Sequence, residues 1–358
     1  IDCGGSLSAI FNSSTYFSGP LDGDGHKIYN FKFDSNNYTG LFGYMTGATI
    51  KNLVLENVSY DARRSNTYLG ALAGYAKRCS ISNVTVNNVV FSHSGHTTTS
   101  AYVGALIGSA VGCTITDCTA KDVSITIPEG QKQIYVGGFI GENDNSKITN
   151  CSVEGKMNVT IKYTGNDNGC LYLGGFSGLN NSTQGIIDCY AMMDIAVKET
   201  KDSTAPSGVK THKACIGGFN GGNINDGARF ENCAIIGDIT VSVELSYFVY
   251  VGGFTAFTDN KNISILENCV YVPKDSGIDV TFMPAPTKEG EKLEQEAYVS
   301  MTIGKIGEQT QDMLSNVIAY RRALKITNEH EKMTETSARI STDLSQFSKK
   351  IQDVISKL

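Results

Sequence analysis

Acidic side chains are the first residues in this sequence that could do chemistry. A glycosidase needs two carboxylates about 5–10 Å apart, and a calcium-assisted lyase needs several of them beside a basic residue. Asp22 and Asp24 alternate on one stretch, but flanking glycines indicate a turn. The other candidate carboxylates share no common position from one repeat to the next: Asp144, Asp167, Asp202, Asp226 and Asp259. No catalytic pair is therefore expected.

Histidine chemistry is also weakly represented, with 5 histidines in the chain. His93 and His96 lie three residues apart in a glycine-containing segment with no cysteine or carboxylate nearby, so solvated loop histidines are favoured over a metal clamp. The zinc-peptidase pattern HExxH is absent, and no phosphate-binding glycine loop opens a helix. We expect no catalytic residue, no bound metal and no cofactor.

Cysteine placement indicates packing more than chemistry. Five of the 10 cysteines end a recurring Ile-x-Asn/Asp-Cys pattern: Cys118, Cys151, Cys189, Cys233 and Cys269. Val58 and Val84 fill the same position in the first units, so the position accepts a small apolar residue, and a free cysteine packs like one. We expect a ladder of reduced thiols in the core.

Cys79 and Cys113 each precede the ladder position of their unit by five residues. They would lie on adjacent units at a turn, so a disulfide between them stays open. Cys170 and Cys215 precede neighbouring glycine motifs by different offsets, which disfavours a bond between them. The chain has no CxxC pair, which argues against zinc.

The candidate residues above belong to a sequence repeat. The pattern Gly-Gly-aromatic-x-Gly returns, with some positions varied, in 40–43, 70–74, 104–108, 137–141, 174–178, 217–221 and 252–256. Its starts lie 30, 34, 33, 37, 43 and 35 residues apart. Such a period indicates an array in which each unit buries its apolar face against its neighbours. It favours a scaffold or a binding protein over an enzyme.

Each unit continues with a polar turn, the Ile-x-Asn/Asp segment and an alternating stretch such as 153–161 or 235–243. Alternation with period two and β-branched residues predict half-buried strands. Three strands per unit, in register, predict an all-β right-handed parallel β-helix with glycines at close approaches. We expect the Asn and Asp residues to stack as turns between coils rather than to bind a ligand: Asn57, Asn83, Asp117, Asn150, Asp188, Asn232 and Asn268.

The length of the units varies mostly just before each glycine motif. The inserts are residues 60–67, 92–101, 128–133, 163–170 and 198–214. Stacking of the units would place all of them along one edge. This insert edge is the expected binding surface, for a host or matrix glycan or protein.

The repeat resembles the GLUG-motif family, whose units read roughly Gly-Gly-Phe-x-Gly followed by Ile-x-Asn-Cys. Such repeats occur in bacterial surface proteins and adhesins, and beside the catalytic domain of some immunoglobulin A-cleaving metallopeptidases. The resemblance covers about residues 20–272. It implies a β-helical fold and an extracellular or cell-surface protein, whereas the motif itself is structural and implies no activity.

Composition divides the chain into two parts. Residues 1–272, rich in Gly, Asn, Val and Ile, form the predicted β-helix; residues 273–289 contain Pro273, Pro284 and Pro286 and are expected to be a linker. Residues 290–358 predict an amphipathic, coiled-coil-like helical tail, with an apolar stripe that steps by three and four: Ile340, Leu344, Phe347, Ile351, Val354 and Leu358.

Such a stripe needs a partner surface. Self-association or docking in a larger assembly is favoured over a helical hairpin that only caps the solenoid. The formal net charge of −6 disfavours nucleic acid, and no apolar run is long enough to span a membrane. The sequence thus predicts a non-catalytic adhesion or filament-building protein; the alternatives are a carbohydrate-active β-helix enzyme and the passive stalk of a larger protein.

Overall fold

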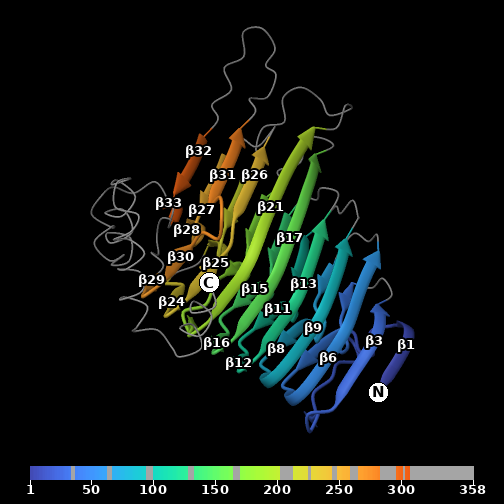
Figure 1. Cartoon of the computed structure of the whole chain (residues 1–358). Coiled ribbons are helices and arrows are strands. Elements are labelled where there is room, and N and C mark those ends of the chain that lie inside the picture. Colours follow the sequence, from blue (N-terminus) through green and yellow to red (C-terminus); the bar gives the residue numbers. More distant parts are fainter. Residues whose placement is uncertain are drawn as a thin grey trace.

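The chain folds as a parallel β-solenoid (Figure 1). The computed structural model describes residues 1–33, 37–62, 67–93, 100–127, 133–163, 170–201, 213–224, 227–243, 248–258, 265–282, 296–300 and 303–306. Within these ranges the regular elements are strands and no residue is helical. Neighbouring strands pair in parallel, coil upon coil, as the repeat predicts.

Three sheets run the length of the solenoid. Sheet C has eight strands: β4 (Tyr38–Thr39), β7 (Thr67–Leu69), β10 (Ser100–Gly104), β14 (Gln133–Gly137), β18 (Cys170–Gly174), β22 (Lys213–Gly217), β27 (Phe248–Gly252) and β32 (Glu296–Ser300). Sheet B also has eight: β5 (Tyr44–Thr46), β8 (Ala73–Lys77), β11 (Ile107–Val111), β15 (Ile140–Asp144), β19 (Ser177–Asn180), β23 (Asn220–Asn223), β28 (Thr255–Thr258) and β33 (Ile303–Ile306).

Sheet A is the largest, with 17 strands, and carries both the Ile-x-Asn segments and the long alternating stretches. Its strands are β1 (Asp2–Leu7), β2 (Pro20–Asp22), β3 (Lys27–Phe33), β6 (Thr49–Ala62), β9 (Ser80–His93), β12 (Thr114–Thr116), β13 (Thr119–Ile127), β16 (Lys147–Thr149), β17 (Ser152–Tyr163), β20 (Ile186–Ile187), β21 (Tyr190–Lys201), β24 (Arg229–Glu231), β25 (Ala234–Ile236), β26 (Ile239–Val243), β29 (Ile265–Glu267), β30 (Val270–Val272) and β31 (Ile278–Phe282).

The glycine motif is a corner rather than one strand. In the coil that begins at Gln133, β14 ends at Gly137 and β15 begins at Ile140, so the chain turns from sheet C to sheet B within the motif. A Cβ atom on Gly138 would lie 2.1 Å from the Gly175 carbonyl oxygen of the next coil. Glycine leaves room for these two coils to approach this closely, whereas the preceding coil has Ala105 at the same register position.

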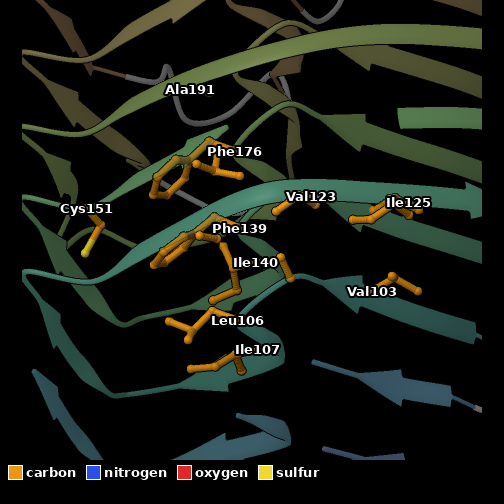
Figure 2. Packing of buried hydrophobic residues seen from close by; sticks show 14 of the residues in the cluster. Val103, Leu106, Ile107, Val123, Ile125, Phe139, Ile140, Cys151, Phe176 and Ala191 are labelled. Carbon is orange, nitrogen blue, oxygen red and sulfur yellow. The ribbon is translucent and has the colours of Figure 1, made fainter. Parts of the chain in front are cut away.

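The core is a stack of side chains, one layer for each coil. Phe139, Phe176, Phe219 and Phe254 of successive motifs are fully or almost fully buried, and their rings stack with centroids 4.7, 4.8 and 4.8 Å apart. Figure 2 shows Leu106 continuing this column below Phe139. At the N-terminal end Phe17 stacks on Phe42 at 4.6 Å, so an aromatic ring from outside the repeat covers the first layer.

The predicted domain boundary is wrong. Strand β31 lies in the segment expected to be a linker and pairs with β26, while β32 and β33 lie in the predicted helical tail and pair with β27 and β28. The last coil escaped detection because its motif has lost the two leading glycines and the aromatic residue: Ser300 is in register with Gly252. The two isoleucines of 303–306 stand three residues apart, a spacing that also fits a helix. The solenoid therefore extends to at least Ile306.

Candidate functional site

The five ladder cysteines occupy one register position on five successive coils, immediately after the turn that follows β12, β16, β20, β24 and β29. All are free thiols, and the four from Cys118 to Cys233 are buried. The Cys151 backbone N–H donates to the Cys189 sulfur at 3.3 Å, and the Cys151 thiol donates to the Thr149 carbonyl at 3.3 Å. Burial holds the pKa of Cys151 well above its usual value, so the thiol stays neutral.

Cys79 and Cys113 lie side by side on adjacent coils. The Cys79 backbone N–H donates to the Cys113 sulfur at 3.3 Å, and the same position in the next coil holds Ser146, whose hydroxyl accepts from the Cys113 N–H at 2.9 Å. Both cysteines are free thiols in the structure. The contact with Cys79, and then burial, raise the pKa of Cys113.

The stacked Asn and Asp turns adopt a left-handed backbone. Asn83, Asn150, Asn232 and Asn268 have φ between 51° and 55°. Their side chains bond from coil to coil: the Asn83 amide donates to Asn52 at 2.8 Å, and the Asn268 amide donates to Asn232 at 3.1 Å. These polar groups therefore hold one another and the backbone turn.

The sequence alignment of the first unit was wrong. Lys51 pairs with Ser82 and Leu53 with Val84, so the residue in register with Asn83 is Asn52, not Asn57, and Leu53 rather than Val58 occupies the cysteine position. Asn57 belongs to a second column of left-handed turns with Asn30, Asn88 and Asp122, whose φ values are 59°, 51° and 51°. The Asn88 amide donates to Asn57 at 2.8 Å. Two similar Asn turns in one long strand made the register ambiguous.

Replacing Asn83 by alanine should lower the free energy of unfolding by about 1–2 kcal/mol, because alanine strains at φ 51° and cannot donate to Asn52. Asn83→Gly keeps the turn conformation and loses only the side-chain bond, so its cost should be smaller. Asn158→Ala, at an exposed position of β17, serves as the control. Urea unfolding followed by circular dichroism measures all three; equal midpoints for the alanine and glycine variants would contradict the argument from backbone strain.

The insert edge is defined by strand ends. The long strands of sheet A end, and the strands of sheet C begin, on the same side of the solenoid: Ala62 pairs with His93, Tyr163 with Lys201, and Ser100 with Gln133. The intervening segments therefore leave and re-enter the solenoid along one edge. Most of the insert residues themselves, including His96, lie outside the described residues, as do the His93 side chain and the tail positions Ile340, Leu344, Phe347, Ile351, Val354 and Leu358.

An aromatic seam runs along the solenoid where sheets B and C meet. We define it as the sheet C column of Tyr38, Tyr68, Tyr102, Tyr135 and Tyr172 with the facing sheet B column. The sheet C rings stack with centroids 5.0, 4.6, 4.8 and 5.5 Å apart. Across the seam, Tyr68 meets Tyr75 of sheet B edge to face at 5.6 Å.

The residue type in the sheet B column changes from aromatic to polar, then to aliphatic and small residues, and back to aromatic along the solenoid. It begins with Tyr44 stacked on Tyr75 at 4.7 Å and continues, in register, through Ser109, Glu142, Leu179, Gly222 and Phe257. The Ser109 hydroxyl donates to Glu142 Oε2 at 2.7 Å. Burial raises the pKa of the Glu142 carboxyl, against the effect of that hydrogen bond. Among the described residues no cation pairs with Glu142.

Further along the seam, the side-chain ammonium group of Lys213 lies among aromatic rings. Lys213 Nζ lies 3.1 Å from the centre of the Phe257 ring and 5.5 Å from the centres of the Tyr172 and Tyr250 rings. It also donates to the Tyr172 hydroxyl at 3.4 Å. This is a cation–π arrangement with one hydrogen bond.

The sequence reasoning missed this seam, although the chain signals it. A tyrosine stands two residues before the first glycine of most motifs, at Tyr38, Tyr68, Tyr102, Tyr135, Tyr172 and Tyr250. Read with period two, those positions face away from the core, where a repeated aromatic residue needs an explanation. The partner column on sheet B has no constant residue type and could not be found in this way.

Two coils match the model of a known repeat. The sequence profile of the GLUG motif matches residues 99–126 and 133–160, which correspond to β10–β13 and β14–β17. The chain carries GLUG repeats. Each matched GLUG repeat contributes one strand to sheet C, one to sheet B and two to sheet A, so the motif encodes one complete coil.

A crystal structure of a candidate immunoglobulin A1 protease from Bacteroides ovatus has a TM-score of 0.48 and 17% identity to this GLUG-repeat chain, over 86% of this chain and 83% of that one. None of the curated proteins matches the chain. In the described ranges no helix has the length and apolarity needed to cross a membrane. Nor do three or more His, Cys, Asp or Glu side chains gather there in a way that could hold a metal ion.

Proposed function

We propose that this chain is a non-catalytic extracellular or cell-surface scaffold that presents the insert edge to a glycan or protein of a host or matrix. The observation that carries the proposal is the in-register alignment of strand ends along that edge, with Ala62 opposite His93 and Ser100 opposite Gln133. A stacked solenoid holds the strand ends that flank successive inserts about 4.8 Å apart from coil to coil. Regular spacing of this kind suits multivalent binding of a repetitive ligand.

The buried polar groups support the scaffold role. The turn amides bond to one another between coils, and the ladder thiols donate to backbone carbonyls within the chain, as Cys151 does to Thr149. These groups serve the fold and are not available to a substrate. The acidic residue of the seam, Glu142, is a single carboxyl with Ser109 as its hydrogen-bond partner, which is not the pair that glycoside hydrolysis requires.

The insert edge is tested by replacing residues 94–99 and 164–169 with glycine–serine segments of equal length. The strands on either side are unchanged, so the circular dichroism spectrum and Tm should stay close to those of the wild-type chain, while binding to glycan and matrix-protein arrays should be lost. Lys121→Ala with Asn158→Ala, on the exposed outer side of sheet A, is the control and should bind normally. Loss of binding in the control alone would reject the insert edge as the binding surface.

The enzyme alternative has its own experiment. A panel of acidic and neutral polysaccharides incubated with the full chain should release no reducing ends and no unsaturated products. Appearance of either product would replace the scaffold proposal with a carbohydrate-active enzyme.

For the C-terminal tail we propose self-association, or docking in a larger assembly, through the stripe from Ile340 to Leu358. Because strands continue to Ile306, the test is a truncation of residues 308–358 rather than a cut at 290. The truncated chain should be a folded monomer, whereas the full chain should have a multiple of the monomer mass by light scattering. Equal masses would rule out self-association through the tail.

A further inference from the structure

The outer face of sheet A is polar in the early coils and apolar in the late ones. Glu56, Asn87 and Lys121 follow one another in an outward column of the early coils. In the late coils two neighbouring columns hold apolar residues on β21, β25 and β30, which lie side by side (Figure 1). We call these residues the apolar patch: Tyr190, Met192, Ala234, Ile236, Val270 and Val272.

The side chains of the apolar patch point away from the core. Ile235, which stands between Ala234 and Ile236, faces inward, because a Cβ atom on Gly218 would lie 3.2 Å from its Cγ1 atom. Successive strand residues alternate between the two faces, so Ala234 and Ile236 face outward. Neither belongs to the hydrophobic clusters that form the core.

Both outward residues are nevertheless buried. Ala234 is 0% exposed and Ile236 is 2% exposed, whereas Glu154, two coils before Ile236 in the same column, is exposed. Neighbours within a sheet shield a side chain from the sides and leave its tip open to solvent. An outward isoleucine therefore reaches so low an exposure when a further segment lies over the sheet.

The apolar stripe of the C-terminal tail is the segment that matches this face. Outside the described ranges, residues 202–212 and 283–295 contain proline and show no regular apolar spacing, whereas the stripe from Ile340 to Leu358 steps by three and four. A flexible chain of the length of residues 307–339 spans about 30 Å, against about 10 Å between packed sheets. The stripe can therefore reach the outer face of sheet A from the end of β33.

The size of the apolar patch selects a part of the stripe. Three coils span about 10 Å along the solenoid, which is the length of about two helical turns. Two turns present three consecutive positions of a stripe that steps by three and four. Phe347 is the aromatic residue of the stripe and offers its largest apolar area, with Leu344 and Ile351 on either side of it.

We propose that the tail docks on the apolar patch of its own chain through Leu344, Phe347 and Ile351. Attachment to the same chain raises the effective concentration of the tail at the patch. The inference rests on the role proposed above for the tail and names the surface that the stripe contacts. Exchange of the tail between two copies makes the same contact between chains and produces the self-association proposed above.

Hydrogen exchange of the full chain, measured by mass spectrometry, tests the docking. Amides of residues 344–351 should exchange at least about tenfold more slowly than in a free peptide of the same sequence. Ile236→Asp should remove most of this protection because it places a charge on the docking surface, and Phe347→Asp should do the same from the other side. Val90→Asp is the matched control, since Val90 is an outward residue of β9, 47% exposed and outside the patch.

The substituted side chains of sheet A point away from the core, so these variants should keep the solenoid, and circular dichroism melts verify this. Met192→Glu, at a half-buried position of the apolar patch, provides a second variant with the same expected loss of protection. It keeps the docking measurable should Ile236→Asp fail to fold.

Equal protection of the tail in the wild-type, Ile236→Asp and Met192→Glu chains would overturn the proposal, as would a wild-type tail that exchanges as fast as the free peptide. Light scattering of the same samples separates the docking from self-association. Loss of protection in the patch variants, with a monomer mass for the wild-type chain, supports the docking and rejects self-association. Unchanged protection in the variants, with a multiple of the monomer mass, supports self-association and rejects the patch.

Discussion

Replacing Phe176 by alanine is expected to lower the free energy of unfolding by about 3–5 kcal/mol. Phe176 is fully buried and stacks between Phe139 at 4.7 Å and Phe219 at 4.8 Å, so its loss leaves a cavity inside the aromatic column (Figure 2). Strands paired in parallel on both sides hold the coils at a fixed spacing, so neighbouring rings cannot close the cavity. The cost should therefore lie at the upper part of that range.

Urea unfolding followed by circular dichroism measures the effect of Phe176→Ala. Phe176→Leu is the matched variant and should cost clearly less, because Leu106 already occupies this column in an earlier coil. In a solenoid a weakened central coil can also unfold separately from its neighbours, which would appear as a broadened or two-step transition. A single transition with an unchanged midpoint would contradict the role assigned to the column.

Gly178→Ala is also expected to lower the free energy of unfolding strongly. Here the cause is an added atom, whereas Phe176→Ala removes atoms. Its Cβ would lie 2.6 Å from the Gly141 carbonyl oxygen and 2.6 Å from the Val136 backbone nitrogen. Both are main-chain atoms of the preceding coil, so neither can rotate away and the backbone must shift. Among the seven glycine motifs only the last has alanine at this position, at Ala256. Overpacking costs about 1–3 kcal/mol where side chains can adjust, and we expect at least the upper end of that range here.

Gly5→Ala is the control for this effect, because a Cβ at Gly5 would have no atom within 4 Å. Its Tm should match that of the wild-type chain, whereas Gly178→Ala should melt at a markedly lower temperature or fail to accumulate as a folded protein. Equal melting of the two variants would show that the motif glycines are not required for the stacking of the coils.

Much of this architecture could be predicted from the chain alone. The return of Gly-Gly-aromatic-x-Gly predicted stacked units, and the structure has them as parallel coils with Phe139, Phe176 and Phe219 in one column. The cysteine positions could be assigned to a common site because valine replaces cysteine at Val84. Periodic patterns are reliable here because each coil faces nearly the same surroundings as the next, so one environment selects the same residue type repeatedly.

The predictions were wrong where the repeat varied, or where one sequence pattern was compatible with two structural positions. Asn52 and Asn57 both mark left-handed turns in one strand, and only pairing with the next coil shows which belongs with Asn83. The final coil lost the two leading glycines of its motif, so β32 and β33 were expected to be part of a helix. In these places the neighbouring coil decides the structure, and a single segment does not contain that information.

The sequence by itself therefore determined the coil, the close approaches at its glycines and the apolar positions of the core, because these depend on local backbone geometry and on burial repeated in every unit. The tertiary structure alone decided the register of the turn columns, the end of the solenoid and the pairing of Tyr75 with Ser109 and Glu142 across successive coils. Those features depend on contacts between residues about one coil apart in the chain, and their chemistry arises only when stacking brings unlike side chains together.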